Sequence, residues 1–406
     1  MSNPYNEVAL GTVADFSYGY TAAAQDTGDT RFLRITDIDE NGSLKKNDAK
    51  FIDFSDELER YQVKKGDILV ARTGGTFGKT LFYKDDCPAV YASFLIKITL
   101  NTEKLLPYFY FHFSQSNRYW FQANNLVTGG GQPQFNANVL KEIVVPLPPL
   151  PEQKAISDLL STWDEAIEKT EQLIQAKEKR FQWLLRELIS KPQNTQKNAE
   201  WKKVKLGEIC SPVSRKNSEN NTNVLTSSAQ VGLVSQLEYY NKSVSAENVT
   251  GYCLLQKGEF AYNRSSAKGY PYGATKRLDR YEKGVLSTLY LCFALKPGAP
   301  CESDFLLHLF ESGAVNRELC AVCQEGARSH GLLNITKSDF FGIRLFLPPQ
   351  DQQKKIQTAL NTAQEEIDLL KQLADKYKIQ KRGLMQKMLT GEWRVKPEIV
   401  NQYMEM

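Results

Sequence analysis

Two stretches of the chain repeat apolar side chains at alternating steps of four and three residues. One series runs from Ile156 to Leu188, and the other runs from Ile356 to Met388. This spacing places the apolar side chains on one face of a helix and is typical of a coiled-coil seam. It predicts two helices of about 37 residues, each roughly 55 Å long. The seam residues expected at the helix interface are Ile156, Leu160, Trp163, Ile167, Ile174, Leu184, Ile356, Leu360, Ile367, Leu370, Tyr377 and Leu384.

The segments that lead into the two helices are near copies of one another. The stretch "LPPLPEQKAI" at 147–156 returns as "LPPQDQQKKI" at 347–356. Further matches follow in the same order, at offsets between 192 and 200, and they place Arg72 opposite Arg264 and His112 opposite His308. These matches join 8–13 with 204–209, 64–72 with 256–264, and 108–116 with 305–313. The chain is therefore predicted to use one globular unit and one connecting helix twice.

The two long helices are expected to pack on each other. A helix of this length is unstable in water unless its apolar seam is covered. Because the chain passes through a whole globular unit before the second helix begins, an antiparallel pair is the favoured arrangement. The alternative is that each helix lies across its own domain.

The segments outside the helices predict mixed domains. Alternating stretches such as "RFLRITDI" at 31–38 and "FLIKITL" at 94–100 are typical of strands, and helical patterns follow near the end of each unit. The predicted class is α+β, with two globular domains in a pseudo-two-fold tandem repeat, separated by two long antiparallel coiled-coil helices. The predicted boundaries are 1–149 for domain one, 150–190 for the first spacer helix, 191–200 for a linker, 201–347 for domain two, 348–391 for the second spacer helix and 392–406 for a tail.

The stretch "TGGTFGKT" at 73–80 differs by one residue from a phosphate-binding loop, because Thr73 replaces the leading glycine. Such a loop joins a strand to a helix, since the phosphate binds at the helix N-terminus. The residues that follow contain a proline, an acidic pair and strand-like alternation, and the matching stretch after Arg264 has no Gly-Lys-Thr. The sequence also lacks a serine-hydrolase elbow, a zinc-protease helix and a methyltransferase Asn/Asp-Pro-Pro-aromatic loop. Catalysis is therefore not expected.

A zinc site is considered and not favoured. Cys320 and Cys323 form a single CxxC pair, with Cys292, Cys301, His308 and His330 as possible further ligands. The pair lies in a helical pattern and no second CxxC exists, so buried thiols are the favoured interpretation. His112 and His308 lie in aromatic or leucine-rich helical patterns, which favours core positions for both. No cofactor and no metal are predicted in this chain.

Composition adds limits on location and partners. The net charge of +4 permits a polyanionic partner without requiring one. The sequence shows no secretory leader and no apolar run long enough to span a membrane, and its seven cysteines have no regular spacing. A cytoplasmic protein with reduced thiols and no membrane contact is predicted.

Polar loops in both units carry side chains suited to nucleic-acid recognition. Arginine can pair with guanine, asparagine or glutamine can pair with adenine, and lysine neutralises phosphate. The alternative is that these are ordinary solvated loops. Ser329 is a further polar residue in the loops of the second unit. The predicted DNA contacts are Arg72, Thr73, Thr76, Lys79, Gln132, Gln134 and Asn136 in the first unit, and Arg264, Ser265, Lys268, Tyr272, Lys276, Arg277, Arg328, His330 and Asn334 in the second.

These features resemble the specificity subunits of type I restriction-modification systems. The resemblance covers nearly the whole chain and is strongest in the two proline-rich helix starts, in "RFLRITDID" at 31–39, in "GGGQPQFN" at 129–136 and in "KRGLMQKMLTGEWRV" at 381–395. It implies two target-recognition domains that each bind half of a bipartite site on double-stranded DNA. It also implies helices that set the spacing and dock two modification (methyltransferase) subunits, and restriction/translocase subunits in the full complex. S-adenosylmethionine would belong to the methyltransferase subunits.

The second unit departs from the pattern of the first. It has "GARSHGLLN" at 326–334 in place of the Gln-Pro loop, and it offers only "TNVLTSSAQ" at 222–230 in place of "RFLRITDID". Trp163, Trp183 and Trp393 are candidates for the partner surface, or for core positions. About 10 base pairs are expected between the half-sites if both domains bind one face of the duplex. The alternative function is a two-domain protein adaptor that does not contact DNA.

Overall fold

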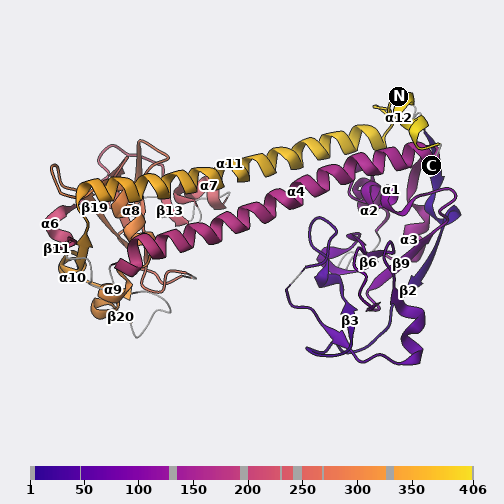
Figure 1. The fold of residues 1–406 in the computed structure, drawn as a ribbon, viewed down its shortest axis with the longest axis horizontal. Coiled ribbons are helices and arrows are strands. Elements are labelled where there is room, and N and C mark those ends of the chain that lie inside the picture. Colours follow the sequence, from indigo (N-terminus) through magenta and orange to yellow (C-terminus); the bar gives the residue numbers. More distant parts are fainter. Residues whose placement is uncertain are drawn as a thin grey trace. The chain divides into compact units, whose positions relative to one another are not determined.

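A computed structural model describes the chain as two compact units. The first takes Met1–Glu171 and Gln372–Met406, and the second takes Gln172–Lys371. Each unit holds one globular domain of strands and short helices and one half of each long helix (Figure 1). The predicted α+β class with a tandem repeat is confirmed. The described residues are 5–45, 47–127, 135–192, 200–228, 231–240, 249–267, 269–325 and 333–404.

The first unit contains two four-stranded sheets. The first is antiparallel, in the order β2-β9-β6-β7, and the second, in the order β4-β3-β8-β5, has one parallel pair, β3 with β8. Its short helices α1 and α2 supply Phe109, Phe113 and Tyr119 to the core beside the first sheet. The bounds are β2 (Ala14–Tyr18), β3 (Thr30–Leu33), β4 (Phe51–Ile52), β5 (Gln62–Val63), β6 (Ile68–Ala71), β7 (Thr80–Phe82), β8 (Ala89–Tyr91), β9 (Leu95–Leu100), α1 (Pro107–Ser114) and α2 (Asn117–Leu126).

The second unit repeats the first sheet of the first unit and changes the second sheet. Its antiparallel sheet has the order β12-β19-β16-β17, which matches β2-β9-β6-β7 strand for strand. In place of the other sheet, two separate pairs form, β13 with β14 and β15 with β18. The bounds are β12 (Cys210–Pro212), β13 (Leu225–Ser228), β14 (Gly232–Ser235), α7 (Gln236–Tyr240), β15 (Cys253–Gln256), β16 (Phe260–Asn263), β17 (Ala274–Arg277), β18 (Lys283–Leu286), β19 (Tyr290–Leu295), α8 (Ser303–Glu311), α9 (Asn316–Val322), β20 (Gln324–Glu325) and β21 (Leu333–Asn334).

A two-stranded ribbon leads into each long helix. In the first unit β1 (Asn6–Ala9) pairs with β10 (Val144–Leu147), which follows α3 (Ala137–Glu142). In the second unit β11 (Lys202–Lys205) pairs with β22 (Arg344–Leu347) in the equivalent register. Strand β22 comes directly after α10 (Lys337–Gly342). A proline pair ends each ribbon, because proline cannot donate to a strand ladder but is tolerated at a helix start. The remaining short elements are η1 (Leu10–Thr12), η2 (Ile35–Asp37), η3 (Asp56–Tyr61), α6 (Leu206–Ile209) and α12 (Pro397–Gln402).

The two long helices lie where the heptad pattern predicts them. α4 spans Leu150–Leu185 and continues through a π-helical turn at Arg186–Ser190, and α11 spans Gln350–Leu389. α11 ends just before Gly391, whose φ of 72° is a conformation that favours glycine. The compact units divide both helices between them. The predicted domain boundaries stay predictions, and residues 193–199 of the predicted linker lie outside the described residues.

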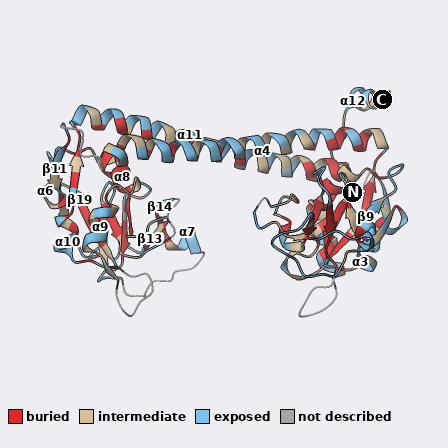
Figure 2. Cartoon of the chain, turned by 60° about the horizontal axis from the view of Figure 1, so that its bottom comes forward, coloured by how far each residue is buried: buried red, intermediate tan, exposed pale blue. Residues whose placement is uncertain are grey.

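The helix halves within each unit run antiparallel and bury their seam. In the first unit the rings of Trp163 and Tyr377 lie edge to face, with centroids 5.7 Å apart. In the second unit the Nζ atom of Lys177 lies 2.6 Å from a carboxylate oxygen of Glu366. Figure 2 shows buried residues along the facing sides of the helices and exposed residues on their outer sides. Most predicted seam residues are buried, and Trp163, Leu184, Leu370, Tyr377 and Leu384 are half-buried.

The helix ends also complete the domain cores. In the first unit Leu160 of α4 and Met388 of α11 join the cluster that includes Phe109. In the second unit Leu185 and Leu360 join the cluster around Phe293. The heptad pattern did not identify Leu185, because this residue lies next to the seam position Leu184 and packs on the domain core. Each domain core is therefore closed by the start of one long helix and the end of the other.

A buried glutamine fixes the first turn of each long helix. Oε1 of Gln353 accepts the Glu302 N–H at 2.9 Å, and Nε2 donates to the carbonyls of Pro300 and Pro348 at 3.0 and 2.9 Å. These bonds join the strand end, the helix and the segment before α8. The same three bonds link Gln153 to the Leu106 N–H and to the carbonyls of Lys104 and Pro148. This role explains why a glutamine occupies the matching position in both helix starts.

Both ends of the chain meet at Glu152 in the first unit. The Glu152 side chain is 3% exposed. The Tyr5 hydroxyl donates to it at 3.1 Å, and Nε and Nη2 of Arg394 donate to its two oxygens at 2.6 Å each. Burial and the nearby carboxylate raise the pKa of Tyr5, so its hydroxyl stays protonated. The bidentate Arg394 bond compensates the buried charge.

The substitution Gln353→Ala is expected to lower the free energy of unfolding by about 3 kcal/mol, because three buried or partly buried main-chain groups lose their partners. Urea denaturation of the intact chain, followed by circular dichroism, measures the loss. The matched control is Gln364→Ala, since among the described residues the Gln364 side chain makes one exposed hydrogen bond, to Asp368 of the same helix. We expect the control to change stability by about 0.5 kcal/mol or less. Equal losses for the two variants would contradict the role of the buried amide.

Candidate DNA-recognition surface

The stretch "TGGTFGKT" forms the connection between β6 and β7. A single 3-10 turn, η4 (Gly74–Thr76), precedes strand β7. Gly74 and Gly78 have φ values of 70° and 74°, which favour glycine. A strand follows where a phosphate-binding loop needs a helix, so the prediction that this stretch is not such a loop is confirmed.

Aromatic side chains hold this β6–β7 loop. The Phe77 ring packs against the rings of Trp120 and Phe135, with centroids 6.2 and 6.0 Å apart. The hydroxyl of the buried Tyr119 donates to the Gly78 carbonyl at 2.9 Å. A Cβ at Gly78 would approach Trp120 to 3.1 Å, so glycine is also required for the close contact. The β6–β7 loop is therefore held in place by contacts with α2 and with the segment before α3.

Arg72 lies at the end of strand β6, between two aromatic rings. Its guanidinium lies 5.2 Å from the ring centroid of Tyr18 and 5.9 Å from that of Phe94. Nη1 donates to the Ser93 carbonyl at 3.4 Å. Tyr18 is 43% exposed and Phe94 is 53% exposed, so the group forms part of the surface. The loop-based prediction missed both aromatic residues, because each belongs to a strand pattern or borders one.

Arg264 occupies the matching place in the second unit. Its Nε and Nη2 atoms donate to the carbonyls of Leu289 and Thr288 at 2.9 and 2.7 Å. These carbonyls precede β19, as the Ser93 carbonyl precedes β9. The carbonyls of the two arginines accept the N–H groups of Phe135 (2.9 Å) and Leu333 (2.8 Å). The predicted correspondence between Arg72 and Arg264 is thus confirmed in three dimensions.

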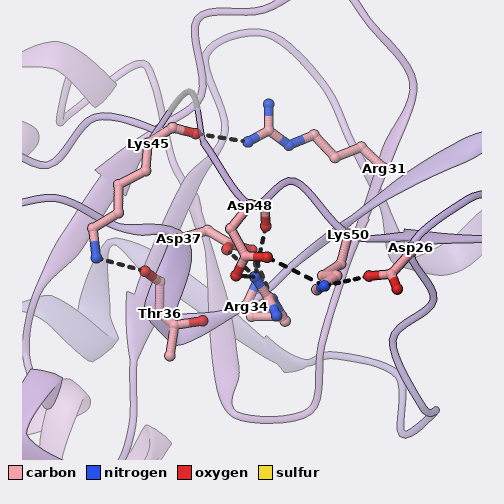
Figure 3. A network of polar contacts seen from close by, with 8 residues as sticks. All are labelled: Asp26, Arg31, Arg34, Thr36, Asp37, Lys45, Asp48 and Lys50. Carbon is pink, nitrogen blue, oxygen red and sulfur yellow. Dashed lines mark hydrogen bonds and ion pairs between the residues drawn. The ribbon is translucent and has the colours of Figure 1, made fainter. Parts of the chain in front are cut away.

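The motif "RFLRITDID" forms a polar network around Arg34 (Figure 3). Nη2 of Arg34 bonds to the Asp37 carboxylate at 2.7 Å, and the Arg34 N–H bonds to the same group at 2.8 Å. Nη2 also reaches the Asp48 carbonyl at 3.0 Å, and Lys50 pairs with Asp48 and Asp26. The charged residues of this motif hold the segment after β3. In the second unit, the side-chain amides of Asn217 and Asn221 hold the segment before β13 through hydrogen bonds to the main chain of Asn221 and Asn223.

The comparisons with known proteins agree with this architecture. Residues 3–178 match the family described as type I restriction modification DNA specificity domain. The type I restriction enzyme MjaVIII specificity subunit of Methanocaldococcus jannaschii is 25% identical, over 82% of this chain and 80% of that relative. The chain is therefore similar to type I restriction-modification specificity subunits along most of its length.

Two solved structures share the fold of this chain. The S subunit of a type I restriction-modification system from M. genitalium has 15% identity and a TM-score of 0.58, covering 96% of this chain and 97% of its own. A chain from a structural study of type I complex assembly has 14% identity and a TM-score of 0.51, covering 97% of this chain and 100% of its own. These matches extend through both repeats.

Two of the predicted DNA contacts, Lys276 and Arg277, already have acidic partners, so DNA contact by either stays a prediction. Lys276 is only 5% exposed, and its ammonium pairs with Glu311 and bonds to the Tyr270 hydroxyl. The half-buried Arg277 bonds to Asp279 and Asp304 at 2.7 Å. The reason is that both side chains of β17 are turned toward α8, which the sequence places 26 or more residues away. These residues attach the helix to the sheet.

Other predicted residues have different outcomes. Asn136 caps α3, since its side-chain oxygen accepts the N–H groups of Asn138 and Val139 at 3.0 and 3.1 Å. Asn334 is exposed in β21, and DNA contact by either residue stays a prediction. The side chains of Thr73, Thr76, Lys79, Ser265 and Tyr272 are half-buried at the loops. Gln132, Gln134, Lys268, Arg328, Ser329 and His330 lie outside the described residues.

The cysteines and two of the histidines give no metal centre. The seven cysteines are free thiols, and in the described part of the chain no group of three or more His, Cys, Asp and Glu could hold a metal ion. His308 shares a bond of 2.7 Å with Asn361, and His112 is fully buried, 4.0 Å from Asp164. Burial lowers the pKa of both histidines and keeps them neutral. Within the described residues, no helix is long and apolar enough to cross a membrane.

The substitution Lys276→Ala is expected to destabilise the protein by about 3 kcal/mol, because Glu311 would lose the partner of its partly buried charge. The matched control is Lys79→Ala, since no acidic partner of Lys79 exists among the described residues. Its expected change is about 0.5 kcal/mol or less. Thermal unfolding of the two variants and the wild type measures both effects. Unchanged stability of the Lys276 variant would show that the ion pair with Glu311 does not stabilise the domain.

Proposed function

We propose that this chain is the non-catalytic DNA-recognition component of a type I restriction-modification complex. Each globular domain binds one half of a bipartite site on double-stranded DNA. The observation that carries the proposal is the duplicated strand-end arginine: Arg72 and Arg264 lie at equivalent positions of two equivalent sheets. A protein with one site would not need two such surfaces.

The chemistry of the loops suits a nucleic acid. Lys79 supplies an ammonium group for phosphate, and Thr73 and Thr76 supply hydroxyl groups. The Tyr18 and Phe94 rings offer flat apolar surface beside the Arg72 guanidinium. In the second unit these ring positions carry other side chains, so the two domains present different surfaces on one scaffold. We infer that they recognise different half-sites.

The outer sides of the helices suit protein partners. Large apolar side chains there are exposed, and apolar groups of this size favour burial against another protein. Trp183 is 57% exposed and Ile379 is 68% exposed, whereas Trp163 is used within the helix pair. We expect two methyltransferase subunits to dock on the helices, with restriction/translocase subunits in the full complex. S-adenosylmethionine would bind to the methyltransferase subunits, and the complex would act in the cytoplasm.

A protein adaptor without DNA contact is the second candidate, favoured by the same exposed apolar side chains. The two functions differ in their response to salt. DNA binding falls steeply as salt rises, because bound counterions are released from the phosphates. An adaptor would bind its partners with little dependence on salt.

The substitutions Arg72→Ala and Arg264→Ala are each expected to relax sequence selectivity in one half-site only. Selection of bound duplexes from a random pool, with the subunit assembled on its methyltransferase partners, measures the preference at each position. Loss of one arginine–base or arginine-organised contact should reduce discrimination there by about 1–3 kcal/mol. Arg186→Ala, at an exposed helical position, is the control. Unchanged selectivity in both half-sites would refute the assignment.

Insertion of one heptad into both helices, after Glu171 and after Lys371, is expected to lengthen the spacing between half-sites. Seven helical residues add roughly 10 Å, or about three base pairs. The selected consensus sequences give the spacing directly. Seven residues inserted between Pro192 and Glu200 leave both helices intact and should leave the spacing unchanged. If the helix insertion also left it unchanged, the helices would not set the spacing.

A further inference from the structure

The second unit contains a pocket that is lined in part by Arg264. It has a volume of about 550 Å³ and lies between the segment after β12, the segment before β19 and the start of α10. Three basic residues line it, Lys216, Arg264 and Lys337, and none of its described lining residues is acidic. The hydroxyl groups of Ser214 and Thr288 also line it. The pocket is therefore a cationic cup with hydroxyl donors.

The first unit has a tyrosine side chain in the corresponding place. Tyr18 of β2 pairs with Ile96 of β9. The β12–β19 register, continued by two residues from Pro212 and Phe293, places Ser214 at the position of Tyr18. The Tyr18 ring lies against Arg72, and its hydroxyl accepts the Ala137 N–H at 3.1 Å. Tyr18 thus bridges the strand-end arginine and the start of α3.

The second unit lacks this bridge and gains a charge. Ser214 cannot span the distance that the Tyr18 ring spans. The residue that begins α10 is Lys337, whereas alanine begins α3. Both differences act in the same direction, since one removes a ring from the space beside the arginine and the other adds an ammonium group there. The pocket therefore results from two side-chain differences between the repeats, Ser214 in place of Tyr18 and Lys337 in place of Ala137.

Donors remain available on the basic side chains. Arg264 uses Nε and Nη2 to bond the carbonyls of Leu289 and Thr288, and within the described residues its Nη1 makes no hydrogen bond. Lys216 uses one ammonium N–H on the Gly251 carbonyl at 3.1 Å. Several positively charged donors without an acidic partner favour an anion of tetrahedral oxygens, because each oxygen can accept more than one of these bonds.

We propose that this pocket binds a phosphate group of the DNA backbone. The proposal rests on the proposed function. It implies that the second domain binds the DNA backbone differently from the first. A free phosphate ion offers the same chemistry, so the source must be distinguished by experiment. Phosphate contacts position a protein on DNA without selecting sequence. The two lysines of the pocket, Lys216 and Lys337, should therefore contribute to affinity for all sequences alike.

The test uses the full-length chain and a duplex of random sequence, with affinity measured over a range of salt concentrations. Ser214→Tyr, which rebuilds the ring of the first unit, and Lys337→Ala are each expected to reduce the slope of log affinity against log salt by about one. Ser214→Ala leaves the pocket open and is the matched control. The reverse pair Tyr18→Ser with Ala137→Lys should increase the slope by about one. Thermal unfolding confirms that each variant is folded.

A second arm replaces chloride by inorganic phosphate at constant ionic strength. Phosphate should compete with DNA for the wild type and less for Ser214→Tyr. If phosphate competes but the variants keep the wild-type slope, the pocket binds the free ion and the proposal is overturned. A change in preference at single base pairs would assign the pocket to base recognition and overturn it as well. Absence of salt-dependent DNA binding in the wild type would instead refute the proposed function.

Discussion

The burial of two helix ends in each domain core is the contact on which the rest of the structure depends. Leu160 and Met388 close the core of the first unit, and Leu185 and Leu360 close the core of the second. Long helices need their apolar seam covered, and the small domains need more apolar surface than their own strands supply. The domains cover the apolar surface at the helix ends, and the helix ends supply apolar surface to the domain cores. The helices are therefore structural members of both domains.

The repeat and the helices could be predicted because their signals are local. Heptad spacing marked Ile156 to Leu188, and the helix lies there because spacing of this kind is set by the geometry of the helix itself. The copied helix starts contain Gln153 and Gln353, whose identity is explained by three equivalent hydrogen bonds. The division of the second sheet into two pairs was not predicted, since strand pairing depends on residues distant in sequence.

The site was predicted less completely, for the same physical reason. Arg72 and Arg264 follow strands in matched motifs, so their equivalence was visible in the sequence. Lys276 also appeared as a loop cation, but a glutamate on α8 binds it. Tyr18 lies far from Arg72 in sequence, and only the strand register brings the ring to the guanidinium. Residue type and loop position therefore identified candidates without showing which charges were already neutralised.

The two repeats show how one scaffold can carry two surfaces. The sheet order and the strand-end arginine are kept, and the side chains around the arginine differ. A tyrosine covers the arginine in one unit, and a serine leaves it open in the other. Changes of this kind leave the sheet and the helix contacts untouched, so surface chemistry can vary while the core stays the same.

The contact at Glu152 bears on the order of the domains along the chain. Tyr5 near one terminus and Arg394 near the other bind the same carboxylate. Two segments far apart in the sequence are therefore held side by side, and a connection between them could replace the connection between the domains. A chain permuted in this way would keep the contacts at Glu152. The contacts at Glu152 therefore do not dictate which domain comes first along the chain.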